Sequence, residues 1–235
     1  MRGFGIFSML SKQELIAETL YRHAPEAEVV LDVGYAQNPN PALRGEIHGI
    51  DIVNNEKPKH YREVRKVDLN LCSIPYDNSF FDAVGMGCVL AHVTNPFGLL
   101  AELHRVLKKD GILVLSTPNP NYYWETVLNV FFHRMKHRVC RAKWEEHFCE
   151  FSRFTMRTIA HRAGFSVIDE VGTTFHVVKF GWKFQPKRFP GISYEIIYVL
   201  KKDREPSHYT TYETKGEIIK VPSALRGRGV SQDTS

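Results

Sequence analysis

The chain has few cysteines and no long apolar run, and each shortage excludes a class of protein. Its four cysteines, Cys72, Cys88, Cys140 and Cys149, are too scattered among 235 residues for a disulfide framework, which favours a reducing compartment. No segment approaches the roughly 18 uninterrupted apolar residues of a membrane-spanning helix. We therefore expect a cytoplasmic protein.

The charge and the composition also lack any extreme. A net charge of +5 with 43% hydrophobic and 24% charged residues is typical of an ordinary globular protein. So small a positive excess is common in enzymes that bind no nucleic acid. The first ten residues show no small-residue cleavage site, and Ser11 with Glu14 forms a capping box, so we expect an amphipathic arm and then a helix from Lys12 to His23.

Short apolar segments alternate with helical patterns along most of the chain. The apolar segments are 28–34, 46–52, 63–69, 80–90 and 112–119, and the later helical patterns are 95–111 and 155–164. This alternation predicts one α/β domain over residues 1–203, with a doubly wound, mostly parallel sheet and helices on both faces. Segments 165–171 and 192–202 are joined by a loop too short for a crossover helix, so we expect an antiparallel pair. Residues 204–235 lack apolar periodicity and are expected to be flexible.

Capping residues define the ends of the two later helices. Asn95 and Pro96 suit the start of the first, and Gly111 suits its end after two lysines. Thr155 is placed to cap the second helix, and Gly164 to end it.

The order of several short motifs is the most specific pattern in the chain. The motifs are "VVLDVG", "GIDI", "VDLN", "IPYDNSFFDAV", "VLAHVTNP", "LLAELHRVLKKDGILVLSTPN" and "HRAGF". Through them the chain resembles the class I, Rossmann-like S-adenosylmethionine-dependent methyltransferases, in particular the group with the quinone-biosynthesis and other small-molecule methyltransferases. The resemblance implies a seven-stranded sheet with the last strand inserted antiparallel, and S-adenosylmethionine as cofactor.

The resemblance also implies roles for residues at the strand ends. The turn after the first strand would hold the amino-acid end of the cofactor, Asp51 the ribose hydroxyls, and Asp68 with Leu69 the adenine. A carboxylate at the carboxyl end of a parallel strand faces the ligand crevice and can accept two hydroxyls. The alternative is that these acids only cap or turn the chain. The expected cofactor-binding residues are Asp32, Gly34, Ala36, Asn38, Asp51, Ile52, Asp68, Leu69 and Gly87.

The first turn lacks most of the glycines that this family uses. The usual turn has glycine at three alternate positions, of which Gly34 keeps the first, while Ala36 and Asn38 stand at the others. Alanine adds one methyl group where the backbone approaches the ligand. Asparagine tolerates a positive φ, so it can keep a turn that a branched residue would break.

The residues around this turn leave two questions open. Asn40 and Pro41 suit the start of a helix of about one turn that Gly45 would end, and such an N-terminus favours a carboxylate. Pro39 and Pro41, however, remove two backbone donors. The ring of Tyr35 either points into the crevice and blocks it or packs outward. A non-catalytic binding or scaffold protein on the same fold therefore stays an alternative.

Three residues are candidates for chemistry at the acceptor. His92 follows the fourth strand at the methyl-facing position of the family, although Ala91 stands where that family often has an acid. His147 and Glu150 lie just before the last helix. A general base is needed only where the acceptor loses a proton, as a hydroxyl does. For each histidine a structural role, bonded to nearby backbone, is an equal alternative.

An aromatic and basic segment at about 120–152 interrupts the alternation of strands and helices. It has three alternative roles: a lid over an acceptor with an acidic group, a helix packed on the sheet with solvated charges, or a helix on a membrane surface. Cys140, His147 and Cys149 are irregularly spaced and lack a fourth ligand, so we predict no metal site.

A methyltransferase acting on a small or carrier-linked acceptor, such as a sugar or a lipid-linked hydroxyl, is the function that the sequence favours. A nicotinamide dehydrogenase is less favoured, because the turn at Gly34 lacks the G-x-G-x-x-G pattern. Nucleic acid is not an expected partner, because "AHVTNP" differs from the Asn/Asp-Pro-Pro-Tyr/Phe loop of amino-methylating enzymes. The sequence leaves the acceptor and the oligomeric state open.

Overall fold

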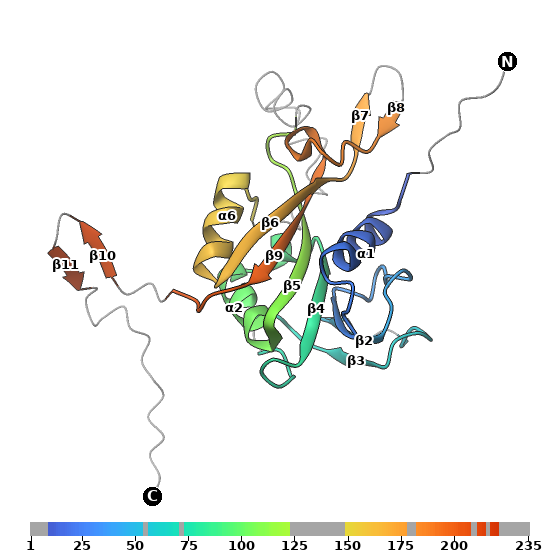
Figure 1. The fold of residues 1–235 in the computed structure, drawn as a ribbon, viewed down its shortest axis with the longest axis horizontal. Coiled ribbons are helices and arrows are strands. Elements are labelled where there is room, and N and C mark those ends of the chain that lie inside the picture. The colour runs from blue at the N-terminus through green and yellow to red at the C-terminus, as the bar shows by residue number, and fades with distance from the viewer. Residues whose placement is uncertain are drawn as a thin grey trace, which may run out of the picture.

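A seven-stranded sheet forms the centre of the molecule, with strands in the order β3-β2-β1-β4-β5-β9-β6 (Figure 1). The computed structural model describes residues 9–53, 56–70, 73–122, 149–177, 182–207, 211–214 and 217–220. The strands of this sheet are β1 (Val29–Val33), β2 (Glu46–Asp51), β3 (Glu63–Lys66), β4 (Phe81–Gly87), β5 (Leu107–Pro118), β6 (Phe165–Gly172) and β9 (Glu195–Lys202). The helical elements are α1 (Lys12–His23), α2 (Pro96–Val106), α6 (Arg153–Arg162), η1 (Val89–His92) and η3 (Pro190–Ile192).

The direction of the strands confirms the predicted fold class. Strands β1 to β5 pair in parallel, whereas β9 runs antiparallel to both β5 and β6. The connection from β6 to β9 contains the short antiparallel pair β7 (Phe175–Val177) and β8 (Trp182–Phe184), with no crossover helix among its described residues. A chain that returns without a crossover pairs antiparallel, as the two late apolar segments predicted.

Helices cover both faces of the sheet, so its central strands are buried on both sides. Helix α1 packs on one face, and α2 and α6 pack on the other (Figure 1). In β1, Leu31 and Val33 belong to the hydrophobic layer with α2 and α6, while Val30 belongs to the layer with α1. The near-continuous apolar runs of the strands follow from this double burial.

The predicted C-terminal end of α2 is wrong. The helix ends at Val106, and the two lysines and Gly111 belong to β5. The carbonyl groups of Arg105 and Val106 accept hydrogen bonds from the backbone amides of Ser79 and Phe80, at 2.9 and 2.8 Å. A neighbouring segment of the chain therefore provides these carbonyls with the hydrogen bonds that a glycine-capped turn would otherwise provide.

The predicted N-cap of α6 is also wrong by one turn. The helix begins at Arg153, and the cap is Ser152, whose hydroxyl accepts a hydrogen bond from the backbone amide of Thr155 at 3.1 Å. Both residues are good caps, and the sequence pattern alone does not distinguish them. Gly164 follows the helix with a φ of +92°, in agreement with the predicted end.

The segment after residue 203 contains a small sheet of its own. Strands β10 (Thr211–Thr214) and β11 (Glu217–Lys220) form an antiparallel pair separate from the seven-stranded sheet. The flexibility of residues 204–235 and the extent of the domain stay predictions. None of the helices formed by the described residues has the length and apolarity needed to cross a bilayer.

Candidate functional site

A cavity of about 930 Å³ opens at the carboxyl ends of the parallel strands. Ten of the residues expected from the sequence line it: Asp32, Gly34, Asn38, Asp51, Ile52, Asp68, Leu69, Gly87, His92 and Glu150. This edge of an open α/β sheet is where ligands bind in such folds, and the volume lies within the range of small-molecule sites. His147 lies outside the described residues.

Asp51, at the end of β2, ties the first turn to the sheet. Its Oδ2 accepts a hydrogen bond from the backbone amide of Ala36 at 3.0 Å, and its Oδ1 accepts one from Val53 at 2.9 Å. Ala36 does not line the cavity, so its contribution is this backbone bond. Each carboxylate oxygen has a second lone pair, which leaves Asp51 able to accept hydroxyl groups of a ligand.

Asp32, near the end of β1, is a buried acid held by neighbours from other parts of the chain. The hydroxyl of Tyr61 donates a hydrogen bond to its Oδ2, and the backbone amide of Asn40 donates a second at 3.3 Å. Burial raises the pKa of Asp32 to about 6, against the opposing effect of the Tyr61 bond. Asp32 therefore changes its charge close to neutral pH.

The expected helix between Pro41 and Gly45 is absent, and a turn stands in its place. The side chain of Asn40 closes this turn, because its Oδ1 accepts from the amide of Ala42 at 3.1 Å and its Nδ2 donates to the carbonyl of Gln13 at 2.9 Å. Asparagine competes with helix formation through such bonds. The predicted helix N-terminus is therefore not available as an anion site.

The ring of Tyr35 packs into the core and does not block the cavity. Its side chain is only 1% exposed, it lies 5.8 Å from the ring of Tyr61, and it is not part of the cavity wall. A Cβ atom at Gly49 of β2 would lie 2.8 Å from the Tyr35 ring, so the glycine makes room for it. A glycine inside a strand is a sequence signal of such a close approach, which our prediction for Tyr35 did not use.

Gly34 is the one glycine of the usual turn that the chain keeps, and its conformation explains why. It has a φ of +84°, its amide donates to the carbonyl of Ile50 at 2.8 Å, and a Cβ atom here would lie 2.4 Å from Cγ2 of Val89. Asn38 lines the cavity without a positive φ, so the conformational tolerance of asparagine is not used there.

The two described candidates for acceptor chemistry come from distant parts of the chain. His92 ends η1, and the carbonyl of its neighbour Ala91 accepts a hydrogen bond from the amide of Cys149 at 3.2 Å. This bond ties the segment that carries Glu150 to η1, and both His92 and Glu150 line the cavity. A carboxylate and an imidazole in one cavity wall can hold or move a proton of an acceptor.

Cys88, between β4 and η1, is not a candidate nucleophile. Its backbone is left-handed, with a φ of 62°, which is uncommon for a residue other than glycine. Burial raises the pKa of its thiol to about 11. The thiol therefore stays protonated at neutral pH, and the thiolate is the reactive form.

Helix α1 and the loop before β9 supply cavity residues that the sequence did not reveal. Helix α1 contributes Lys12, Gln13 and Ile16 to the cavity wall. The wall also contains Asn119, which follows the end of β5, and Tyr194, which ends the loop before β9. The Lys12 ammonium lies 3.4 Å from the carboxylate of Glu195. The sequence shows that α1 is amphipathic, but not which sheet face it covers. Within the described ranges no group of three or more His, Cys, Asp or Glu residues is arranged so that it could hold a metal ion.

Comparison with known proteins identifies the family to which the chain belongs. A family model described as a methyltransferase domain matches residues 11–170. Over 83 residues the chain is 34% identical to the demethylmenaquinone methyltransferase of Staphylococcus haemolyticus, a match that covers 32% of this chain and 35% of that protein. The chain thus spans only about a third of the length of this curated relative.

Two solved structures share the fold at low sequence identity. A SAM-dependent methyltransferase of Thermotoga maritima superposes with a TM-score of 0.59 and 17% identity, covering 81% of this chain and 87% of that one. The 1,6-didemethyltoxoflavin-N1-methyltransferase of Burkholderia thailandensis, solved with 1,6-didemethyltoxoflavin and S-adenosylhomocysteine bound, has a TM-score of 0.54, 15% identity and coverages of 81% and 78%. At such identities the likeness establishes the fold.

Proposed function

The chain belongs to the methyltransferase-domain family, and from this premise we propose that it transfers a methyl group from S-adenosylmethionine to a small-molecule acceptor. The cavity at the carboxyl ends of β1, β2 and β4 is the observation that carries the proposal. It gathers three strand-terminal acids, Asp32, Asp51 and Asp68, with the backbone of Gly34 and Gly87. A nucleoside with an amino-acid end matches this donor and acceptor set.

Each group of residues has one role in the proposal. Asp51 accepts the two ribose hydroxyls through the lone pairs that its backbone bonds leave. Asp68 and Leu69 border the adenine, and the turn from Gly34 to Asn38 borders the amino-acid end. Asp68 is held for this by a bond from the Asn70 amide to its Oδ1 at 2.9 Å.

The acceptor is proposed to lie between the cofactor and the wall that carries His92 and Glu150. The cofactor supplies a methyl group on a sulfonium, so the protein contributes chiefly position and exclusion of water. Where the acceptor has a hydroxyl, His92 or Glu150 takes its proton. A quinone-type ring, as in the name of the curated relative, is the first candidate, and a carrier-linked, sugar-linked or lipid-linked hydroxyl is the next.

Titration calorimetry with S-adenosylhomocysteine tests the proposal. The wild-type protein is expected to bind at micromolar affinity, and Asp51→Asn to bind about 10- to 100-fold more weakly, the equivalent of charge-assisted hydrogen bonds. Asp77→Asn is the matched control, because Asp77 is exposed and lies outside the cavity wall. Thermal melting confirms that each variant is folded.

Methyl transfer to a demethylated naphthoquinol provides the second readout. His92→Ala and Glu150→Gln are expected to lower kcat with little change in the affinity for S-adenosylhomocysteine. Well-folded wild-type protein that binds no S-adenosylhomocysteine would overturn the proposal and support the non-catalytic alternative. If Asp77→Asn weakened the binding of S-adenosylhomocysteine as much as Asp51→Asn does, the role proposed for Asp51 would be wrong.

A further inference from the structure

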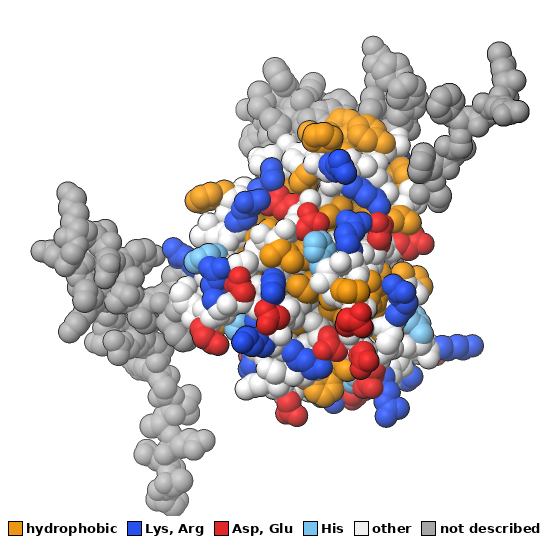
Figure 2. Space-filling model, viewed as in Figure 1, with side chains coloured by type: hydrophobic (Ala, Val, Ile, Leu, Met, Phe, Trp, Pro, Cys, Tyr) orange, Lys and Arg blue, Asp and Glu red, His pale blue; other side chains and the backbone are white. Residues whose placement is uncertain are grey.

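Exposed apolar side chains gather between β8 and β9, next to basic residues. Phe184, Phe189, Ile192 and Tyr194 are 43%, 68%, 44% and 44% exposed. Figure 2 shows hydrophobic and basic side chains together at the end of the molecule where Figure 1 places β7 and β8. We call residues 183–194 the β8–β9 surface. Contiguous exposed apolar patches rimmed by polar residues mark interaction sites, whereas single exposed apolar side chains are common on any protein surface.

Hydrogen bonds fix the backbone of the β8–β9 surface to the rest of the protein. The Asn119 amide donates to the carbonyls of Gly191 and Ser193 at 3.0 and 2.8 Å. Gln185 exchanges two hydrogen bonds with the backbone of Leu10. Phe189 and Ile192 therefore stay exposed although their own segment is fixed to the body of the protein, and their exposure is not a consequence of a loose loop.

The β8–β9 surface carries positive charge and no acid. From residue 183 to 194 the charged residues are Lys183, Lys187 and Arg188. Lys187 pairs with Glu18 at 2.8 Å, whereas Lys183 and Arg188 are exposed and form no ion pair within the described part of the chain. Two unpaired cations beside aromatic side chains match the headgroups and the interface of an anionic bilayer.

A row of aromatic rings connects this surface to the cavity. Phe184 lies 4.9 Å from Phe175, Phe175 lies 6.1 Å from Tyr122, and Tyr122 lies 5.6 Å from Tyr194, measured between ring centroids. Tyr194 also lines the cavity. Ring contacts thus link the exposed Phe184 to Tyr194 in the cavity wall, as expected where a ligand enters close to the surface that the protein contacts.

We infer that the β8–β9 surface docks this protein on an anionic lipid bilayer, with Phe189 and Ile192 in the interface and Lys183 and Arg188 on the headgroups. The inference is independent of the proposed function, since docking needs neither cofactor nor methyl transfer. It also differs from the predicted membrane-surface role of the segment 120–152, most of which lies outside the described residues.

Vesicle sedimentation with the full chain tests the inference. Vesicles of phosphatidylcholine mixed with phosphatidylglycerol are expected to bind the protein, and phosphatidylcholine alone to bind it far less. Phe189→Ser is expected to weaken binding about tenfold. Lys183→Glu and Arg188→Glu are each expected to weaken it at least roughly fivefold, with less effect at high salt.

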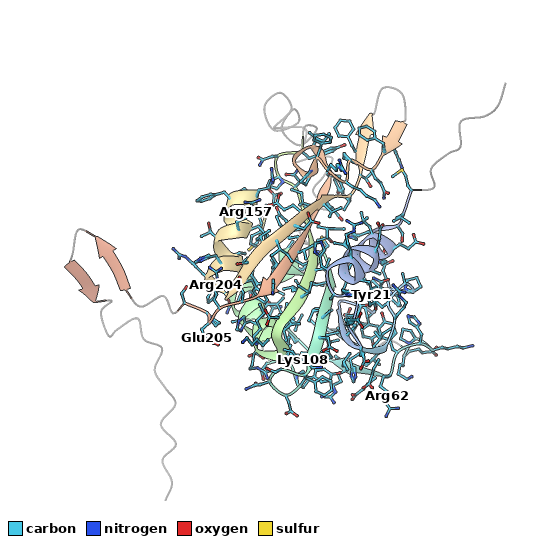
Figure 3. All side chains as sticks on the ribbon, viewed as in Figure 1. Tyr21, Arg62, Lys108, Arg157, Arg204 and Glu205 are labelled. Atoms are coloured by element: carbon cyan, nitrogen blue, oxygen red, sulfur yellow. The ribbon has the colours of Figure 1, made fainter. Side chains whose placement is uncertain are left out.

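Two variants provide matched controls. Ile168 on β6 is 44% exposed, as is Ile192, so Ile168→Ser controls for the loss of an exposed apolar group. Arg62→Glu controls for charge reversal, because Figure 3 shows Arg62 at the opposite end of the molecule from β7 and β8. Both controls are expected to bind as the wild type does.

Three outcomes would overturn the inference. The first is a wild-type protein that does not sediment with anionic vesicles. The second is equal weakening by the control variants, which would place the contact elsewhere on the chain. The third is a dimer in light scattering that Phe189→Ser dissociates, which would assign the surface to a second copy of this chain. All the substituted side chains are exposed, and circular dichroism checks that the variants are folded.

Discussion

At the scale of single residues, Asp32 of the cavity wall forms a buried hydrogen-bonded pair with Tyr61 behind it. The pKa of Asp32 is raised from 3.8 to about 6, so the folded state binds the proton more tightly than the unfolded chain. The contribution of Asp32 to the free energy of unfolding therefore falls as the pH rises from 3.8 to about 6. The hydrogen bond from the Tyr61 hydroxyl opposes this loss, because it favours the charged carboxylate.

Replacing Tyr61 by phenylalanine is expected to make the protein less stable in a pH-dependent way. Tyr61→Phe leaves the Asp32 carboxylate with one donor fewer, which costs about 1–3 kcal/mol when the carboxylate is charged. The loss is expected to be larger at pH 7.5 than at pH 5, where the carboxyl is protonated. Urea unfolding of both proteins at the two pH values measures the difference.

Tyr21→Phe is the control for this prediction. Within the described part of the chain, the Tyr21 hydroxyl, on α1 in Figure 3, is bonded only to the backbone of Arg44, to whose carbonyl it donates at 2.7 Å. Because neither partner titrates between pH 5 and 7.5, Tyr21→Phe is expected to cost the same free energy at both pH values. The same pH-independent loss in Tyr61→Phe would show that Asp32 does not titrate in this range.

The sequence located those cavity residues whose position follows from strand ends. Gly34, Asp51 and Asp68 each come directly after or at the end of an apolar segment, and parallel strands bring such ends to one edge. Tyr61 could not be placed, because it lies 29 residues from Asp32 in the chain and meets it only in the folded protein. Tyr194 lies in the predicted strand segment 192–202, but β9 begins only at Glu195, so the pattern did not show that Tyr194 enters the cavity from the loop before this strand.

At the scale of elements, the turn between β1 and β2 is where prediction and structure differ most. Polar side chains form hydrogen bonds with the backbone of this turn, so its backbone groups need no helix to be satisfied. Residues that suit the start and the end of a helix therefore did not predict the structure here. Gly45 ends the turn with a φ of +91°, and a Cβ atom would lie 2.3 Å from the carbonyl oxygen of Glu28. The buried parts of the central strands β1, β2, β4 and β5 were predicted because burial on both faces gives them near-continuous apolar runs, whereas the short strands β7, β8, β10 and β11 were not predicted.

Gly45→Ala is therefore expected to destabilise the protein by more than about 2 kcal/mol, the sum of left-handed strain and the clash with Glu28. Gly191→Ala is the control, because its Cβ atom would meet only Nη1 of Arg153 at 3.8 Å, and its effect is expected to lie within about 0.5 kcal/mol. Thermal and urea unfolding measure both. Equal stability of the two variants would contradict the conformation described for the turn.

At the scale of the whole molecule, the cavity joins parts of the chain that belong to different layers. Helix α1 contributes Lys12, Gln13 and Ile16 from one face, η1 contributes His92, and Glu150 comes from the segment before α6. The carbonyl of Gln13 also accepts the side-chain amide of Asn40, which links α1 to the first turn. A ligand in the cavity therefore contacts α1, the turn and η1 together, while β6 and most of α6 stay remote.

Hydrogen exchange with and without S-adenosylhomocysteine is expected to show this division. At a ligand concentration of about 100 Kd, binding stabilises the ligand-competent state by about 2.7 kcal/mol, which slows exchange through its opening by up to about 100-fold. Protection is expected in residues 12–17, 34–40, 67–70 and 86–93, with no change in β6. The ligand would be shown to bind outside this cavity if protection were confined to β6, or if α1 exchanged at the same rate with and without the ligand. Protection of α1 together with the turn would show that the two elements respond to the ligand as one unit. We expect this coupling because the side chain of Asn40 in the turn is bonded to the carbonyl of Gln13 in α1.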